Sequence, residues 1–358
     1  MSPAMECQNH TFTYTNKDFV YEVCRNDDKT SKHEARFDSA LKSGWSEKMN
    51  RGLFRYQLGQ LETRVLTGEC GYIAQLNTQR GTERRKPQLI LSIRQQFDPK
   101  LFNFNKINQE EILFQMCKAA DSCVQNGIGS SCFVIINASP LEFGHCLLVP
   151  EPLRCHPQIL TPLAVRFGVE SVFLSADPSY RVGFNSLGAF ASVNHLHLHG
   201  YYLNHPLKIE WIRVEPILPE KNLYRVADFT TGFMFYTEEP HTIADTVCRL
   251  TDILVERNIA HNVYMTRGCH PDSDGKASPT RHGVRVFVWP RKSCFGAKEE
   301  SAFNVALCEL AGHLPFKNRQ DFDSLDEDGV KAIVQKYTLG EEEFTELQKL
   351  VVGELTST

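Results

Sequence analysis

The chain has 358 residues, of which 42% are hydrophobic and 23% are charged, a composition that excludes fibrous, collagen-like and wholly disordered proteins. At roughly 150 residues per domain, this length suggests two domains or one large duplicated domain. The 39 Lys and Arg residues and 43 Asp and Glu residues leave a net charge of −4, which argues against general attraction to nucleic acid or to an anionic membrane. Any phosphate site must therefore be local.

The N-terminus, MSPAMECQNHTFTYTNKDF, lacks the apolar core of a signal peptide, and no stretch approaches the roughly 18 apolar residues that a membrane span needs. The twelve cysteines include no CxxC pair, so neither a disulfide framework nor a zinc site of the usual spacing is expected. We therefore expect a soluble cytoplasmic protein that binds no nucleic acid and no membrane.

The first elements follow a polar N-terminal stretch. Residues 1–32 are expected to form a flexible leader. From Phe37 to Val65 apolar residues recur at helical spacing, which predicts two amphipathic helices over residues 33–68 with a break near Gly52.

Short segments with alternating β-branched or aromatic residues come next. They predict strands over residues 71–76, 89–93 and 102–107. The loop over residues 78–87, TQRGTERRKP, is strongly basic. Such a loop can contact phosphates, although a basic loop is more often simply solvated.

The middle of the chain predicts a hairpin-like pair of strands over residues 132–137 and 145–150, joined by a turn that contains Pro and Gly. A helix is expected over residues 158–175, and a strand over 180–185 is followed by a segment of small residues that leads into a histidine-rich strand.

The rest of the chain repeats this order in weaker form, which suggests a twofold duplication. Strands are expected near residues 209–214, 222–228, 232–236, 262–266 and 284–289, and helices near 243–257, 300–312, 327–337 and 341–351. We therefore divide the chain into the leader, an N-terminal half over residues 33–205 and a C-terminal half over 206–358, with an α+β fold.

Three histidines alternate with leucines in the segment NHLHLHGYY. On a strand, His195, His197 and His199 share one face while the leucines turn to the core. Residues on one face lie about 6.6 Å apart, which is too far for one metal ion to be held by all three without a bend. A phosphate or nucleotidyl site is the favoured interpretation, and a metal site and an inert polar face are the alternatives.

The residues before the histidines support a phosphate site. Residues 183–192, GFNSLGAFAS, are small or carry Asn and Ser donors, so a phosphate can approach the backbone there, although a plain turn would have a similar composition. A neutral imidazole can attack phosphorus when its other ring nitrogen keeps its proton and is held by an acceptor.

These residues resemble the histidine triad (HIT) superfamily of nucleotide hydrolases and transferases. The pattern is His-φ-His-φ-His-φ-φ after an Asn-containing loop, and the strand from Gly144 to Pro150 is similar to the Gly-His strand of the superfamily. Five segments over about 45–320 also resemble the phosphorylases of GDP-hexoses, a branch that includes the plant GDP-L-galactose phosphorylases. They are residues 102–107, 140–150, 182–203, 262–268 and 302–315.

The resemblance implies a HIT-like antiparallel sheet with flanking helices, and two HIT-like halves in one chain. It implies a nucleotidyltransferase that works by ping-pong transfer without a cofactor or metal. In that reaction GDP-glucose guanylylates a histidine and releases glucose 1-phosphate, and inorganic phosphate then releases GDP.

The resemblance also assigns roles to residues. His197 is the nucleophile, His195 stabilises the arrangement or orients the phosphate, and His199 contacts phosphoryl oxygens or the leaving group. The loop residues that match the substrate-binding loop of the family are Asn185, Gly188 and Ser192.

One departure keeps other functions open. The related galactose-1-phosphate uridylyltransferase has Gln in the third position of the triad, whereas this chain has His199, as the hydrolase branch does. The triad alone is therefore compatible with a HIT-type nucleotide-sugar hydrolase, and a non-catalytic nucleotide-binding protein is a further alternative.

Charge that develops at phosphorus needs oriented donors. The candidates from strand ends and loops are Arg181, Arg267, Arg281, Arg285 and Arg291. Guanine needs a carboxylate or backbone acceptor for its N1 and N2 donors, and residues 102–107, FNFNKI, are a candidate wall for the base.

Overall fold

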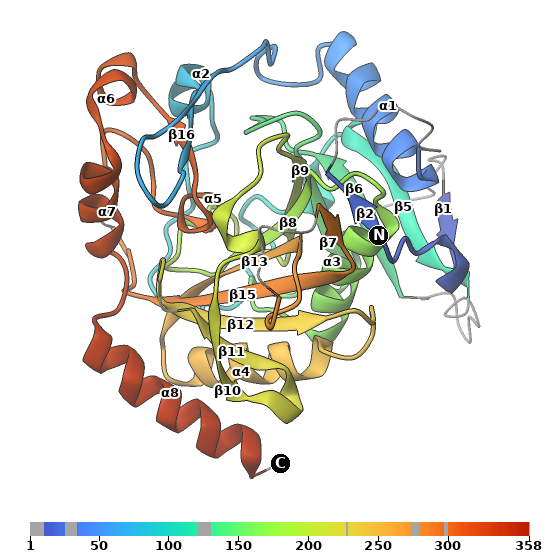
Figure 1. Cartoon of the computed structure of the whole chain (residues 1–358). Helices are drawn as coiled ribbons and strands as arrows, with labels where there is room; N and C mark the ends of the chain where they lie inside the picture. The colour runs from blue at the N-terminus through green and yellow to red at the C-terminus, as the bar shows by residue number, and fades with distance from the viewer. Residues whose placement is uncertain are drawn as a thin grey trace.

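A large mixed sheet runs across the molecule in the computed structural model, which describes residues 11–25, 34–119, 130–226, 228–273, 279–296 and 300–357 (Figure 1). The sheet has eleven strands in the order β1-β5-β6-β7-β9-β8-β13-β15-β12-β11-β10. Only the β1–β5 pair is parallel, and the other pairs in this sheet are antiparallel. The α+β class is confirmed.

The strands of this sheet fall into two sequential groups. The first comprises β1 (Thr11–Tyr14), β5 (Ile112–Lys118), β6 (Ser131–Ile136), β7 (Cys146–Pro150), β8 (Tyr180–Asn185) and β9 (Leu198–Tyr202). The second comprises β10 (Val214–Leu218), β11 (Leu223–Val226), β12 (Gly232–Thr237), β13 (Ala260–Gly268) and β15 (Gly283–Arg291).

The order of elements repeats between the two groups. Strands β5, β6 and β7, helix α3 (Pro162–Leu174) and strands β8 and β9 correspond to β10, β11, β12, α4 (Ala244–Glu256), β13 and β15. The two sets meet where β8 pairs with β13, with Asn185 opposite Asn262. The sheet order is therefore symmetric about this central pair, as a duplicated unit requires.

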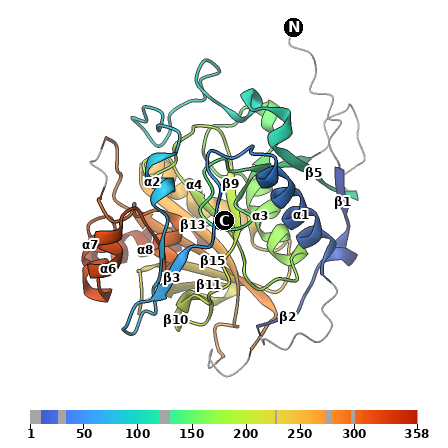
Figure 2. The same ribbon diagram turned by 90° about the horizontal axis from the view of Figure 1, so that it is seen from above.

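Each face of the sheet buries its own apolar core. The first core packs α1 (Arg36–Asn50), α3, α4 and α8 (Glu341–Thr356) against the sheet. The opposite core lies under a small sheet of β3 (Glu62–Val65), β4 (Ile73–Leu76) and β16 (His313–Phe316). The short helices beside it are α5 (Leu307–Ala311), α6 (Arg319–Ser324) and α7 (Glu327–Gln335). Helix α1 lies beside α3, away from α6 and α7 (Figure 2).

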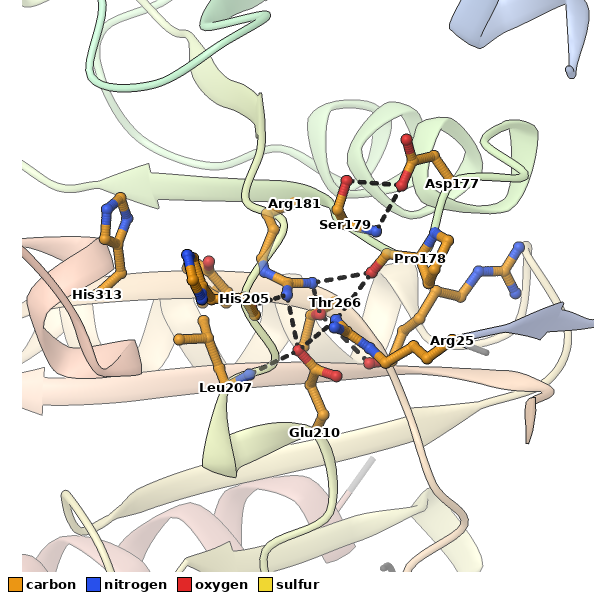
Figure 3. Close-up of polar contacts among 12 residues, drawn as sticks. Arg25, Asp177, Pro178, Ser179, Arg181, His205, Leu207, Glu210, Thr266 and His313 are labelled. Carbon is orange, nitrogen blue, oxygen red and sulfur yellow. Dashed lines mark hydrogen bonds and ion pairs between the residues drawn. The ribbon is translucent and has the colours of Figure 1, made fainter. Parts of the chain in front are cut away.

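A buried ion-pair network fastens the N-terminal segment to both halves (Figure 3). Glu210, in the 3₁₀ turn Lys208–Glu210, accepts hydrogen bonds through Oε1 from Arg181 at 2.7 Å and from Arg25 at 2.8 Å. The Leu207 amide donates to the same oxygen at 2.9 Å. Arg181 and Glu210 are fully buried, so each charge depends on the other for compensation. Arg25 immediately follows β2 (Val23–Cys24), which pairs with β14 (Thr280–Arg281).

The N-terminal segment differs from the flexible leader that we expected over residues 1–32. Its described part, residues 11–25, is built into the fold, because β1 adds to the edge of the large sheet beside β5. Tyr14 is buried and donates a hydrogen bond to Glu170 of α3. Residues 1–10 and 26–32 lie outside the described residues.

Several predicted elements between residues 51 and 107 are wrong. The first helix is α1, but residues 53–68 contain no second helix, because the chain turns at Gly52 with a φ of +72° and runs on without helix to β3. Residues 89–93 form no strand. Residues 102–107 contain a 3₁₀ turn, Phe104–Lys106, which the Asn103 side chain caps by accepting from the Asn105 amide. The apolar residues of this segment alternate as in a strand, but the segment pairs with no strand in the described part of the chain.

Elements in the central segments agree better with expectation. The predicted strands at residues 71–76, 132–137, 145–150 and 180–185 and the helix at 158–175 are confirmed as β4, β6, β7, β8 and α3. The helix expected over residues 300–312 is limited to α5, and α6 was not predicted. No helix among the described residues is long and apolar enough to span a bilayer.

Candidate active site

A cavity opens where β8 ends, β9 begins and the β6–β7 turn approaches them. His145, Asn185, Ser192, His197 and His199 line it. Further lining residues come from residues 80–85 around α2 (Thr78–Thr82), from residues 102–107, from the β6–β7 segment, and from residues 304–317 of the C-terminal half. The cavity therefore combines both halves of the chain.

The histidine segment is only partly a strand. We expected His195, His197 and His199 on one β-strand, but β9 begins at Leu198. The Gln158 side chain takes the place of a ladder partner, because its Oε1 accepts from the His197 amide at 2.9 Å and its Nε2 donates to the His197 carbonyl at 3.1 Å. This clamp fixes the His197 backbone outside the regular sheet.

His197 has the geometry of a nucleophile. Its Nδ1 lies 2.7 Å from the His195 carbonyl oxygen, which can only accept, so Nδ1 carries the proton and Nε2 carries the lone pair. Burial lowers the pKa of His197 to about 4, so the ring is neutral near pH 7. The side chain lines the cavity. A neutral imidazole with an accessible Nε2 meets the requirement for attack on phosphorus.

His195 does not line the cavity, in contrast to the expected shared face. Its Nδ1 accepts from the Phe104 amide at 3.0 Å, and its Nε2 donates to the Pro152 carbonyl at 3.1 Å. The ring stacks on Phe104 with centroids 5.5 Å apart. Both ring nitrogens are therefore occupied, and His195 positions the Phe104 turn while its carbonyl holds His197.

His199 is oriented by a second histidine, His145, to which we had assigned no role. The Leu141 amide donates to His145 Nδ1 at 2.7 Å, so the proton of His145 lies on Nε2. This Nε2 donates to His199 Nδ1 at 3.1 Å, which leaves the His199 proton on Nε2. Burial holds the pKa of both rings well below the ordinary value. His199 can thus donate to an anion in the cavity while remaining neutral.

The three predicted loop residues have different environments. Asn185 lines the cavity, and its Oδ1 accepts from Asn262 Nδ2 at 2.6 Å and from the Leu307 amide at 3.1 Å. Ser192 also lines the cavity. Gly188 does not, and its φ of +76° together with the nearby Phe295 ring explains why glycine is needed there.

The arginines proposed from sequence are structural, and none of them lines the cavity. All are buried, and each donates to a backbone carbonyl. They are Arg181, Arg267, Arg281, Arg285 and Arg291. The expectation that they provide oriented donors at phosphorus is wrong, because buried strand positions direct them to carbonyl groups of neighbouring segments.

The cations of the cavity come largely from the basic loop that we expected to be solvated. Arg80, Arg84 and Arg85 line the cavity together with Arg55 and Lys317. The Arg80 amide donates to Asn77 Oδ1 at 3.0 Å, and its guanidinium donates to the Ser139 carbonyl of the β6–β7 turn. The loop is therefore anchored to the active-site side of the sheet.

An aromatic wall lies at one side of His197. Phe102, Phe104 and Ile107 line the cavity, and the Arg85 guanidinium lies 3.4 Å from the Phe102 ring centroid. Among the described residues, no group of three or more His, Cys, Asp or Glu side chains is arranged to hold a metal ion.

Comparison with protein families finds two adjacent matches that together span most of the chain. Residues 36–201 match the model described as GDPGP1-like, N-terminal domain, and residues 215–358 match GDPGP1-like, C-terminal domain.

Curated relatives extend over nearly the full chain. The GDP-D-glucose phosphorylase 1 of Danio rerio is 61% identical over 340 residues, covering 94% of this chain and 96% of the relative. The human protein of the same name is 50% identical, covering 89% of this chain and 84% of the relative. The GDP-L-galactose phosphorylase 1 of Arabidopsis thaliana is 31% identical, covering 88% and 73%.

Among solved structures, the yeast Ap4A phosphorylase Apa2 in complex with Ap4A has a similar fold. The TM-score is 0.57 at 16% identity, and the match covers 86% of this chain and 98% of the yeast chain. At this identity the likeness concerns the fold alone, and it agrees with the expected HIT-like sheet.

The buried histidines predict a marked pH dependence of stability. Besides the partly exposed His241, burial lowers the pKa of six histidines, to about 4 for His195, His197 and His261, to about 3 for His313, and well below the ordinary value for His145 and His199. Between about pH 6.5 and 4 the unfolded chain binds more protons than the folded chain, so the free energy of unfolding falls as the pH falls. We expect Tm to drop by about 10 °C or more from pH 7 to pH 5.

Differential scanning calorimetry checks this expectation. As a control, His261→Gln should flatten the pH dependence without touching the cavity, because His261 lies outside its lining. A Tm that is the same at pH 7 and pH 5 would contradict the assignment of neutral buried histidines.

Proposed function

The chain belongs to the GDPGP1-like family, and from that premise we propose that it catalyses the phosphorolysis of GDP-D-glucose to GDP and glucose 1-phosphate. The observation that carries the proposal is the neutral His197, whose Nε2 lone pair lies in a cavity with five cationic side chains. Relatives that are named GDP-D-glucose phosphorylase 1 at 48–61% identity support the substrate and the reaction.

The first half-reaction transfers a guanylyl group to the enzyme. His197 Nε2 attacks the α-phosphorus of GDP-glucose and forms an N–P bond. The bond from the α-phosphorus to the oxygen bridging the two phosphates breaks, and glucose 1-phosphate leaves with the electron pair on that oxygen. The proton on His197 Nδ1 stays on the ring, where the His195 carbonyl stabilises the positive charge that develops.

The second half-reaction returns the enzyme to its starting state. An oxygen of inorganic phosphate attacks the same phosphorus, the N–P bond breaks, and the electron pair returns to Nε2 as GDP leaves. Phosphate is already anionic at neutral pH, so no general base is needed to activate it. The acceptor occupies the place that the β-phosphate of GDP-glucose left, because the second step is the first in reverse with the hexose absent.

The cationic side chains balance the charge of these phosphates. Arg80 is held against the β6–β7 turn and lines the same cavity as His199, and its charge contributes to lowering the pKa of His199. Arg80 and the Nε2–H of His199 are the donors that we assign to the β-phosphate and to the acceptor. His195 acts as a positioning residue.

Phosphate dependence tests the proposed reaction. With wild-type protein, GDP and glucose 1-phosphate should accumulate from GDP-glucose only when phosphate is present, as measured by anion-exchange chromatography. His197→Asn should lower kcat by more than about 10³-fold, because it removes the nucleophile. The matched control His270→Asn changes a half-exposed histidine outside the cavity and should keep full activity.

Two outcomes would count against this function. GMP produced without phosphate would indicate a hydrolase, and more than about 1% residual activity in His197→Asn would reject His197 as the nucleophile.

The third histidine gives a separate prediction. Glutamine at this position can accept from His145 and still donate to phosphate, whereas alanine can do neither. We expect His199→Gln to retain more phosphorolysis than His199→Ala in steady-state assays, with both less impaired than His197→Ala. Equal loss in the two His199 variants would indicate an acid–base role for this imidazole.

A further inference from the structure

One end of the cavity is an apolar wall that comes largely from one segment of the chain. Three side chains of residues 102–107 line the cavity, and the Phe104 ring contacts the His197 ring with centroids 5.0 Å apart. Phe104 packs in one apolar cluster with Ile135 and Leu147, which line the cavity as well. A flat apolar wall beside the nucleophile suits a purine, because the base of a nucleotide lies one ribose away from the α-phosphorus.

The same segment brings a carboxylate to this wall. A 3₁₀ turn, Gln109–Glu111, leads directly into β5, whose first residue, Ile112, pairs with Ile135 and belongs to the same apolar cluster. Glu111 therefore stands at the edge of the wall, and it lines the cavity. The other carboxylate of the described lining, Glu309, comes from α5 in the C-terminal half. Glu111 is thus the acidic group at the apolar end.

One carboxylate oxygen of Glu111 has a structural role and the other is available. Oε1 accepts from the Asn108 amide at 3.1 Å and so completes the capping box of the 3₁₀ turn. This hydrogen bond fixes the direction of the side chain. Within the described part of the chain Oε2 accepts no hydrogen bond, and the residue is only partly buried. The carboxylate can therefore accept hydrogen bonds from a ligand in the cavity.

A guanidinium accompanies this carboxylate. Arg85 lines the cavity, and its guanidinium lies 3.4 Å from the centroid of the Phe102 ring. Burial lowers the pKa of Arg85, and the negative charge of Glu111 opposes that shift. The apolar end thus offers a strong acceptor and a strong donor beside a flat wall. Guanine carries both complements, because O6 and N7 accept hydrogen bonds while N1–H and the 2-amino group donate them.

We propose that Glu111 accepts hydrogen bonds from N1–H and the 2-amino group of guanine and thereby selects guanine nucleotides. This inference rests on the proposed function and deepens it by naming the residue that selects the base. Adenine would turn the lone pair of its N1 toward the carboxylate, which can only accept, so it should be rejected. Hypoxanthine keeps O6 and N1–H but lacks the 2-amino group, so it loses one of the two hydrogen bonds.

Three substrates that differ only in the base test this selection, namely GDP-glucose, IDP-glucose and ADP-glucose. In the wild type, kcat/KM for phosphorolysis should fall in that order, by at least about tenfold from GDP-glucose to IDP-glucose. Glu111→Gln keeps an oxygen for the Asn108 amide, since glutamine also completes a capping box, but it removes the charge and presents an NH₂ donor. We expect kcat/KM for GDP-glucose to fall at least about tenfold and the preference over IDP-glucose to narrow to about twofold or less.

The matched control is Glu110→Gln, which changes the neighbouring carboxylate of the same turn. Glu110 pairs with Arg51 and does not line the cavity. This variant should keep the wild-type kcat/KM for all three substrates and the wild-type preference among them. Differential scanning calorimetry should show that both variants fold, because neither change removes the cap of the 3₁₀ turn.

The outcomes separate this inference from the proposed function. A narrowed preference in Glu111→Gln, with an unchanged preference in Glu110→Gln, supports the inference. The same loss for every substrate would mean that Glu111 acts on the fold or on the phosphates, and no loss would mean that it contacts no base, so both results overturn it. A wild type that uses GDP-glucose and IDP-glucose equally well overturns it without any variant. A wild type that phosphorolyses none of the three would overturn the proposed function as well.

Discussion

The hydrogen bond from His197 Nδ1 to the His195 carbonyl is the constraint on which the active site depends. It places the lone pair on Nε2, and the Gln158 clamp on the His197 backbone keeps that nitrogen at the cavity. Burial favours the neutral ring, so His197 can act as a nucleophile at neutral pH without first losing a proton. The same carbonyl stabilises the cationic ring that forms on attack. One backbone oxygen therefore serves the resting state and the intermediate.

The duplicated sheet explains why this site needs both halves of the chain. The β8–β13 pair places Asn262 beside Asn185, to which it donates a hydrogen bond through Nδ2. Arg291 donates to Asn262 Oδ1 at 3.2 Å. Asn185 in turn holds the Leu307 amide at the start of α5, which sets the position of the wall that carries Glu309. The N-terminal half thus supplies the nucleophile and the aromatic wall, and the C-terminal half supplies Glu309 and Lys317 to the lining.

The part of the site that could be predicted from sequence is the part encoded locally. The alternating histidines and the small-residue loop lie within one short segment, so the segment is evident from its own pattern. The roles of the individual residues depend on distant contacts. Hydrogen bonds with the Phe104 amide and the Pro152 carbonyl hold the His195 ring outside the cavity lining. The five proposed arginines lie at strand positions that the fold buries. Likewise, the spacing of apolar residues over 102–107 resembles that of a strand, but these side chains line the cavity and the segment forms a 3₁₀ turn.

The basic loop over residues 78–87 is a second case in which the sequence alone did not reveal the role of a segment. Its charge was visible in the sequence, but its function depends on a contact between Arg80 and the β6–β7 turn, about 60 residues away along the chain. Propensity and periodicity describe neighbours in sequence, and they carry no information about such a contact.

The most direct measurement is the mass of the intact protein after rapid mixing with GDP-glucose in the absence of phosphate. The account predicts a GMP adduct that maps to the peptide containing His197, is labile in acid and stable in base, and disappears as GDP forms when phosphate is added. An unmodified protein under fast quench, together with no isotope exchange between glucose 1-phosphate and GDP-glucose, would contradict covalent transfer through His197.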